Sequence, residues 1–325
     1  MKALCGTLVF LNNNNNMRKG FLIVICFMGF SQLAAACDIC GCGVGSYYIG
    51  ILPEFQKRFI GMRYQQKGLL THLRPDGEWS YLTTDETYKT MELWGAWNVG
   101  NRFRVVGFVP YNFIERKNQG VRYSKQGLGD VAVVGYYNVL KSEYTTDSTF
   151  KRVIHTLWIG GGAKLPTGSY DPAGQRAGVG EQNTFQLGTK SFDFTLNAMY
   201  DLRIQDVGLN TNVSYKINTV NDYQYQYGNK LTANVLGYYK FRVAKQTTLA
   251  PNTGVLYETA ATDRREHSRV VEESGGHTLM GIAGTEVSLK RIAFGVNYQV
   301  PLSQDLARGQ VRANNRLMVH MSLGF

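Results

Sequence analysis

Apolar and polar residues alternate along the C-terminal segment of the chain. Every second residue from Leu317 to Phe325 is apolar, whereas the residues between them are mostly polar or small. This period of two predicts a β-strand with one apolar face and one more polar face. Such a strand would be an aggregation hazard at the open edge of a soluble sheet, and closure of the sheet into a barrel removes that hazard.

The same alternation recurs upstream, for example in the segment FDFTLNAMYDLRI and again in IAFGVNYQV. Apolar residues occupy one face of each segment, while amides, hydroxyls and charges occupy the other. The pattern predicts about twelve strands. They are expected roughly at residues 56–66, 88–99, 102–113, 127–140, 151–165, 183–204, 208–218, 230–242, 248–259, 276–289, 291–300 and 314–325.

The connections predicted between these strands alternate in length. Long ones start near Pro166 and Pro301, among others, and short ones lie at 100–101 and 290–291, with 141–150 as the exception. Outer-membrane barrels combine long external loops with short periplasmic turns. We therefore predict an all-β protein, an antiparallel transmembrane β-barrel of about 12 strands with both termini in the periplasm. The alternative is a secreted β-sandwich or lipocalin-like barrel, whose apolar face would pack in a core.

The N-terminal region predicts export from the cytoplasm. From Met17, the segment MRKGFLIVICFMGFSQLAAAC has a positive start, an apolar run and an A-x-A cleavage site, as a cleaved signal peptide does. Residues 1–16 contain a run of Asn and are interpreted as an extension from a start codon assigned too early. The expected segments are this extension, a signal peptide at 17–36, a Cys-rich periplasmic segment at 37–54 and the barrel at 55–325. The expected location is the outer membrane of a Gram-negative cell.

Composition agrees with an all-β chain, since Gly (36) and Tyr (20) are abundant and Pro (7) is scarce. The formal net charge of +11 raises the possibility of a nucleic-acid partner. However, Lys and Arg are scattered along the chain, with no basic run longer than two. We therefore expect no nucleic-acid partner.

In a membrane barrel, the apolar face contacts lipid and the more polar face lines the lumen. The predicted lumen-lining residues are Glu92, Asn98, Asp193, Asn197, Asp201, Arg203, Asn210, Asn212, Lys216, Asn234, Lys240, Asn297 and Gln299. Their mixed charge predicts small polar or amphipathic solutes, and the narrow lumen of about twelve strands favours a gated pore over a free porin. The expected partners are outer-membrane lipid, a small-molecule solute and the barrel-assembly machinery, because the strand ending at Phe325 resembles the assembly signal of bacterial outer-membrane proteins.

Four motifs follow one another in the middle of the chain: GLGDVAVVGYYNVL, GGGAKLPTGSYDP, FQLGTKSFDFTLNAMYD and GLNTNVSYKIN. They resemble the outer-membrane family named for the meta-pathway of phenol degradation, which is related to long-chain fatty-acid transporters. That family carries a G-L-G-D strand opening, a strand ending in L-P-T-G and a G-T-G-S-type element, in which Lys190 here replaces the second Gly. The resemblance implies a barrel that passes small, often hydrophobic molecules. From the residues alone, Gly127, Gly129 and Asp130 are interpreted as a tight strand entry, and the motifs as mainly architectural.

Three cysteines stand close together at the start of the expected mature chain. Cys37, Cys40 and Cys42 have the spacing C-x2-C-x-C, and intervening glycines allow the backbone to curl. Three thiolates so close can converge on a soft ion such as Cu(I) or Zn(II). A disulfide between two of them, lipidation of Cys37 and a docking role for a partner are the alternatives.

Other chemistry is sparse. The sequence has no G-x-S-x-G, H-E-x-x-H or P-loop pattern and no convincing nucleophile–base pair, so we expect no enzyme. The main hypothesis is a transporter or channel for small solutes, with metal binding at the cysteine cluster as an additional expectation. The alternative hypothesis is a periplasmic metal-binding or interaction module that is anchored by a barrel and does not transport.

Overall fold

A computed structural model describes residues 58–145, 151–172, 183–266 and 269–325. All described residues belong to one compact unit. The predicted N-terminal extension, signal peptide and Cys-rich segment lie outside the described residues.

Strands dominate the described part of the chain, as the alternating pattern predicts. Their bounds are β1 (Phe59–Thr71), β2 (Thr84–Val99), β3 (Phe103–Asn118), β4 (Val121–Leu128), β5 (Ala132–Thr145), β6 (Arg152–Lys164), β7 (Asp193–Ile204), β8 (Val207–Ile217), β9 (Tyr225–Gln226), β10 (Lys230–Tyr239), β11 (Phe241–Ala244), β12 (Thr247–Ala260), β13 (Arg264–Arg265), β14 (Arg269–Val270), β15 (Gly276–Leu289), β16 (Ile292–Leu306) and β17 (Arg312–Gly324). One short 3₁₀ turn, η1 (Ala307–Gly309), joins β16 to β17.

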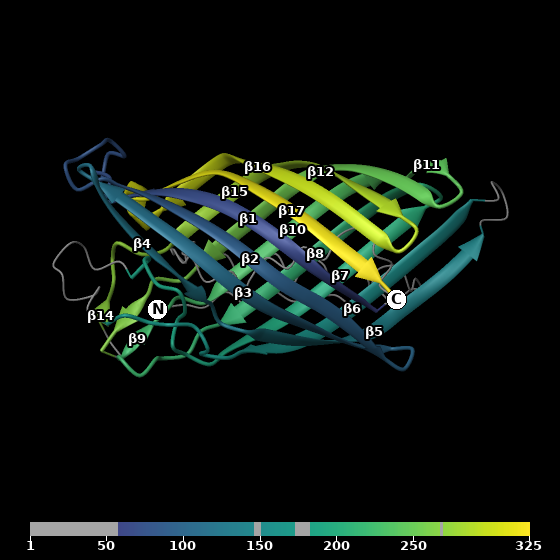
Figure 1. The fold of residues 1–325 in the computed structure, drawn as a ribbon, viewed down its shortest axis with the longest axis horizontal. Coiled ribbons are helices and arrows are strands. Elements are labelled where there is room, and N and C mark those ends of the chain that lie inside the picture. Colours follow the sequence, from purple (N-terminus) through teal and green to yellow (C-terminus); the bar gives the residue numbers. More distant parts are fainter. Residues whose placement is uncertain (1–57, 146–150, 173–182, 267–268) are drawn as a thin grey trace, which may run out of the picture. The chain divides into compact units, whose positions relative to one another are not determined.

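Twelve of these strands form one closed antiparallel barrel in the described part of the chain (Figure 1). The order around it is β1, β2, β3, β5, β6, β7, β8, β10, β12, β15, β16 and β17. The first and last strands pair from Phe59 opposite Gly324 onward, so the sheet closes and β17 has no free edge. The predicted fold class is therefore confirmed.

The two faces of the barrel differ as the sequence pattern predicts. In β17 the side chains of Val319 and Met321 are 41% and 43% exposed, whereas those of the intervening His320 and Ser322 are 2% and 3% exposed. Because successive side chains of a strand point to opposite faces, the apolar rows lie outside and the polar rows lie inside. An outer apolar surface over a closed sheet suits lipid, where every backbone polar group must be paired within the protein.

The two ends of the barrel have different connections. At one end, which we call the short-turn end, residues 100–102, 205–206 and 290–291 join neighbouring strands. At the other, the long-loop end, longer segments such as 165–192, 218–229 and 261–275 connect them. The second and third of these loops contribute β9, β13 and β14, which pair as a small separate sheet.

Several expected boundaries were wrong. The strand expected at 127–140 is β5, which runs from Ala132 to Thr145 and so covers part of the connection expected at 141–150. The strand expected from residue 183 begins only at Asp193. The loop expected after Ile114 is instead a hairpin, because β3 continues to Asn118 and β4 pairs with it. The loop expected near Pro301 is also strand, since β16 runs on to Leu306. Pro301 fits there because the pairing with β15 shifts register at that point, and a proline is tolerated at a bulge.

Candidate functional site

The structure places the predicted lumen residues on the inner side of the barrel wall. Side chains that are buried there are Glu92, Asp193, Asn197, Asn212, Lys216, Asn234, Asn297 and Gln299. Asn98, Asp201, Arg203, Asn210 and Lys240 are partly buried. Since a barrel wall is a single sheet, burial of a strand side chain places it toward the lumen.

Charged side chains in the lumen are paired, some between neighbouring strands and some between strands that do not pair with each other, as Glu258 of β12 and Arg316 of β17 show. Arg63 forms an ion pair with Glu92 on the next strand, and both side chains are at most 5% exposed. Glu258 bonds Arg316 at 2.6 Å and Lys230 at 3.0 Å. Such pairing is what keeps ionised groups tolerable in a poorly solvated interior. Glu258 and Arg316 were not predicted from the sequence, although each stands on the polar side of an alternating strand.

Several buried amide atoms in the lumen have no hydrogen-bond partner among the described residues. They include the amide oxygens of Asn197, Asn234, Asn252 and Gln299, and both amide atoms of Asn297. A buried polar group without a partner costs about 1–3 kcal/mol, so such atoms favour contact with water or a polar solute. These side chains give the lumen hydrogen-bonding capacity.

Part of the lumen wall is apolar and aromatic. Trp94 stacks parallel to Phe108 and meets Phe59 edge-on at a centroid distance of 4.5 Å. Trp158 belongs to the same cluster of buried inner-face side chains. The lumen therefore offers both an aromatic surface and amide groups.

The long-loop end is occupied by the inner loop, a name we use for residues 183–192. Its backbone accepts hydrogen bonds from side chains of the inner wall: Asn112 donates to the Leu187 carbonyl at 3.0 Å and Tyr88 to the Thr184 carbonyl at 3.2 Å. The Leu187 side chain packs with Tyr88 and Ile114 in a buried cluster. The inner loop thus lies within the barrel and narrows it at this end.

The family motifs meet where the inner loop is anchored. Asp130 of G-L-G-D accepts hydrogen bonds from Lys164 at 2.6 Å, from the Gly168 amide at 2.9 Å, and from both the amide and the hydroxyl of Thr189 at 2.9 Å. Lys164 also contacts Asp193 at 2.9 Å. We call these five residues the motif junction. Its carboxylates and ammonium group are at most 1% exposed, so each depends on the others for compensation.

Close backbone approach explains Gly168 of the motif junction and Gly188 beside it. A Cβ added to Gly188 would lie 2.5 Å from an Asp130 carboxylate oxygen and 2.7 Å from the Gly168 Cα. Lys190, which replaces a family glycine, has a φ of 58° and so keeps a backbone conformation that glycine favours. The local turn therefore survives the substitution.

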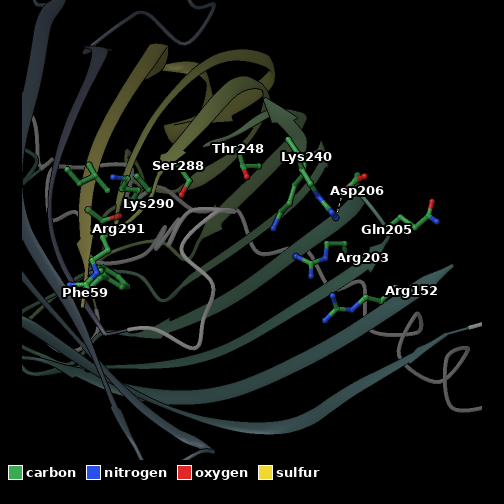
Figure 2. A pocket seen from close by; sticks show the side chains of 15 residues that line it. Phe59, Arg152, Arg203, Gln205, Asp206, Lys240, Thr248, Ser288, Lys290 and Arg291 are labelled. Carbon is green, nitrogen blue, oxygen red and sulfur yellow. Dashed lines mark hydrogen bonds and ion pairs between the residues drawn. The ribbon is translucent and has the colours of Figure 1, made fainter. Parts of the chain in front are cut away.

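The short-turn end contains a cavity of about 330 Å³. Figure 2 shows its lining, in which basic side chains outnumber acidic ones. The basic lining residues are Arg152, Arg203, Lys240, Arg242, Lys290 and Arg291. One acidic side chain, Asp206, faces them from the described residues. Arg203 and Lys240 were predicted to line the lumen, whereas the convergence of the others was not predicted.

Cys37, Cys40 and Cys42 lie outside the described residues, so metal binding there stays a prediction. Within the described ranges, no group of three His, Cys, Asp or Glu side chains is placed to hold a metal ion. No helix in the same ranges has the length and apolar character needed to cross a membrane.

A closed antiparallel barrel with a lipid-compatible exterior and a polar interior defines a transmembrane β-barrel of the outer-membrane type, and the protein is located in the outer membrane. The chain belongs to the family described as "Putative MetA-pathway of phenol degradation", whose model matches residues 65–300. The resemblance seen in the four sequence motifs is thus confirmed.

The solved structures that are similar to this chain include two bacterial outer-membrane barrels. One is an outer membrane channel from Pseudomonas putida F1, with 13% identity, a TM-score of 0.55 and coverage of 85% of this chain and 100% of that one. The other is the beta domain of the Bordetella autotransporter BrkA, with 9% identity, a TM-score of 0.47 and coverage of 83% and 100%. At these identities the first likeness shows a shared fold. No curated protein matches the chain.

Proposed function

We propose that the protein is a gated channel that passes small solutes across the outer membrane. The observation that carries this proposal is the asymmetry of the lumen: a cavity opens at the short-turn end, and the inner loop occupies the long-loop end. A barrel that served only as an anchor would need neither inner-face amide groups without hydrogen-bond partners among the described residues nor an inner loop that buried charged side chains hold in the lumen.

The short-turn end faces the periplasm in this proposal. Outer-membrane barrels carry short turns on that side and long loops outside. Because Phe59 pairs opposite Gly324, the barrel begins and ends at its short-turn end. The inner loop would then restrict passage from the external side.

The expected solutes are small and amphipathic. The aromatic surface around Trp94 favours apolar contact, and the amides of Asn197, Asn234 and Asn297 offer hydrogen bonds. The description of the family concerns phenol degradation, and small aromatic compounds with a polar group fit this combination.

Reconstitution tests the proposal. The full chain is purified in detergent, checked for the heat-modifiable gel mobility of a folded barrel, and examined for conductance in planar bilayers and for solute uptake by liposome swelling. We expect conductance from the wild type. A folded barrel that conducts no ions and admits no sugar would refute the channel.

A matched pair of substitutions tests whether the lumen is the path. Ser214 lies on the inner face and is 4% exposed, whereas its neighbour Val213 is 37% exposed on the outer face. Ser214→Phe should lower the single-channel conductance, because the ring must occupy the lumen. Val213→Phe adds the same ring on the lipid side and should leave conductance unchanged. Equal conductance of the two variants would exclude this path.

A further inference from the structure

We propose that the cavity at the short-turn end is a binding site for small organic anions with an aromatic body, such as aromatic carboxylates. This inference rests on the proposed channel, since it names the solutes that the channel takes. It also makes a claim about binding that is measurable without transport.

The first argument is the charge of the cavity. Its described lining has six basic side chains and one acidic side chain. They come from β6, β7, the β10–β12 connection and the β15–β16 turn, so cations from separate parts of the sequence converge on one space (Figure 2). A concave surface with one sign of charge concentrates ions of the opposite sign.

The second argument is which of these cations are committed to partners. Arg242 bonds Asp206 at 2.8 Å, and Arg152 pairs with Glu143. In contrast, no ion pair joins Arg203, Lys290 or Arg291 to a carboxylate of the described residues. The charges of these three cations are therefore available to bind an anionic ligand. A guanidinium presents its donors in a planar fork that matches a carboxylate.

The third argument is the aromatic surface beside these cations. Phe59 lines the cavity and also belongs to the inner aromatic cluster, where it contacts Trp94. The Arg291 carbonyl accepts a hydrogen bond from Gly324, the residue paired with Phe59, so Arg291 and Phe59 lie at adjoining strand ends. A ligand can therefore place an anionic group on the arginines and an aromatic ring toward Phe59.

The size of the cavity agrees with such a ligand. Its volume of about 330 Å³ lies at the lower end of the range for small-molecule sites. A single-ring carboxylate fits that volume, whereas a polyanionic macromolecule does not. The ligand would meet this site at the periplasmic side in the proposed orientation.

The test measures binding of three probes to the detergent-purified full chain by isothermal titration calorimetry. Benzoate carries both ring and charge, acetate carries the charge, and benzyl alcohol carries the ring. We expect benzoate to bind at least about fivefold more tightly than either of the others, the factor that about 1 kcal/mol of extra contact provides. Equal affinity for benzoate and acetate, or no benzoate binding, would overturn the proposal.

Two variants assign the binding to the cavity. Arg203→Gln/Arg291→Gln should weaken benzoate and acetate by about tenfold, because it removes two uncommitted cations. Phe59→Leu should bring benzoate down to the affinity of acetate while leaving acetate unchanged. The control is Lys141→Gln/Lys245→Gln, which removes two exposed cations that do not line the cavity. If the control weakens benzoate equally, general surface charge is responsible and the site is wrong.

Two further measurements keep these outcomes distinct. Heat-modifiable mobility of every variant separates loss of binding from loss of folding. Conductance of the same wild-type preparation separates the two proposals: binding of benzoate without conductance contradicts the channel, and conductance without benzoate binding contradicts the anion site.

Discussion

Replacing Asp130 with Asn should release the inner loop while leaving the barrel intact. The carboxylate receives four hydrogen bonds, three at one oxygen from Lys164 and Thr189, and one at the other from the Gly168 amide. Asparagine has one acceptor oxygen, so its NH₂ group must face donors on one side. With the oxygen turned toward Lys164, the Gly168 amide loses its acceptor.

The magnitude follows from those contacts. A buried amide left without an acceptor costs about 1–3 kcal/mol, and a neutral acceptor for Lys164 weakens a charge-assisted bond by about 1 kcal/mol. Lys164 keeps Asp193 at 2.9 Å, so its charge is still compensated and the larger penalty for an unpaired buried ion does not apply. The sum is about 3 kcal/mol, which corresponds to about a hundredfold rise in the population of the released loop.

Two assays read out that release. In single-channel recordings, the open fraction of Asp130→Asn should rise toward a hundredfold above the wild type. Trypsin should cleave after Lys190, which lies in the inner loop, faster in the variant than in the wild type. Heat-modifiable mobility should be unchanged, because the twelve strand pairings do not involve Asp130.

The control is Glu272→Gln, which removes an ion pair with Arg308 whose side chain is 63% exposed and which does not line the cavity. Exposed pairs contribute about 0–1 kcal/mol, so neither the open fraction nor the cleavage rate should change beyond a fewfold. If Asp130→Asn matches this control in both assays, the motif junction does not hold the loop, and the gating argument is wrong.

Three further predictions follow from other parts of the molecule. Gly188→Ala forces a Cβ into the packed motif junction, so we expect faster tryptic cleavage of the inner loop, and wild-type cleavage would contradict the close packing. Val255→Arg, at mid-strand on the lipid face, should lower the free energy of unfolding in vesicles by about 2–4 kcal/mol. Val243→Arg, near the short turn, should lower it by only about 0–1 kcal/mol. Equal losses would show that the two positions do not differ in membrane depth. Cys40→Ser/Cys42→Ser should abolish copper or zinc bound to the purified protein, and unchanged metal content would end the metal-binding hypothesis.

The class of fold was readable from the sequence because its signal is local. Successive side chains of a strand alternate between faces, so the rows of apolar residues in β16 and β17 indicate which side meets lipid before any pairing is known. The same periodicity placed residues such as Asn234 and Asn297 on the inner side. The lengths of the connections indicated which end of the barrel has short turns and which has long loops, because these lengths can be counted along the chain.

The inner loop was not readable in this way. Residues 183–192 include Phe185 and Leu187 at an alternating spacing, which predicts a strand, yet their partners are distant. Thr189 bonds Asp130 across 59 positions, and Thr184 is bonded by Tyr88 across 96. Hydrogen bonds between residues so far apart in the sequence depend on closure of the barrel, and no local sequence pattern predicts them.

The sequence by itself determined an outer-membrane-type barrel, the lipid and lumen faces of its strands and the family to which it belongs, because these follow from period, spacing and motif order. The tertiary structure decided what the lumen contains. It brought Asp130, Lys164 and Thr189 together as an anchor, and it gathered Arg203 and Arg291 at one cavity. Both sites arise because closing an antiparallel sheet makes neighbours of residues that the chain keeps far apart.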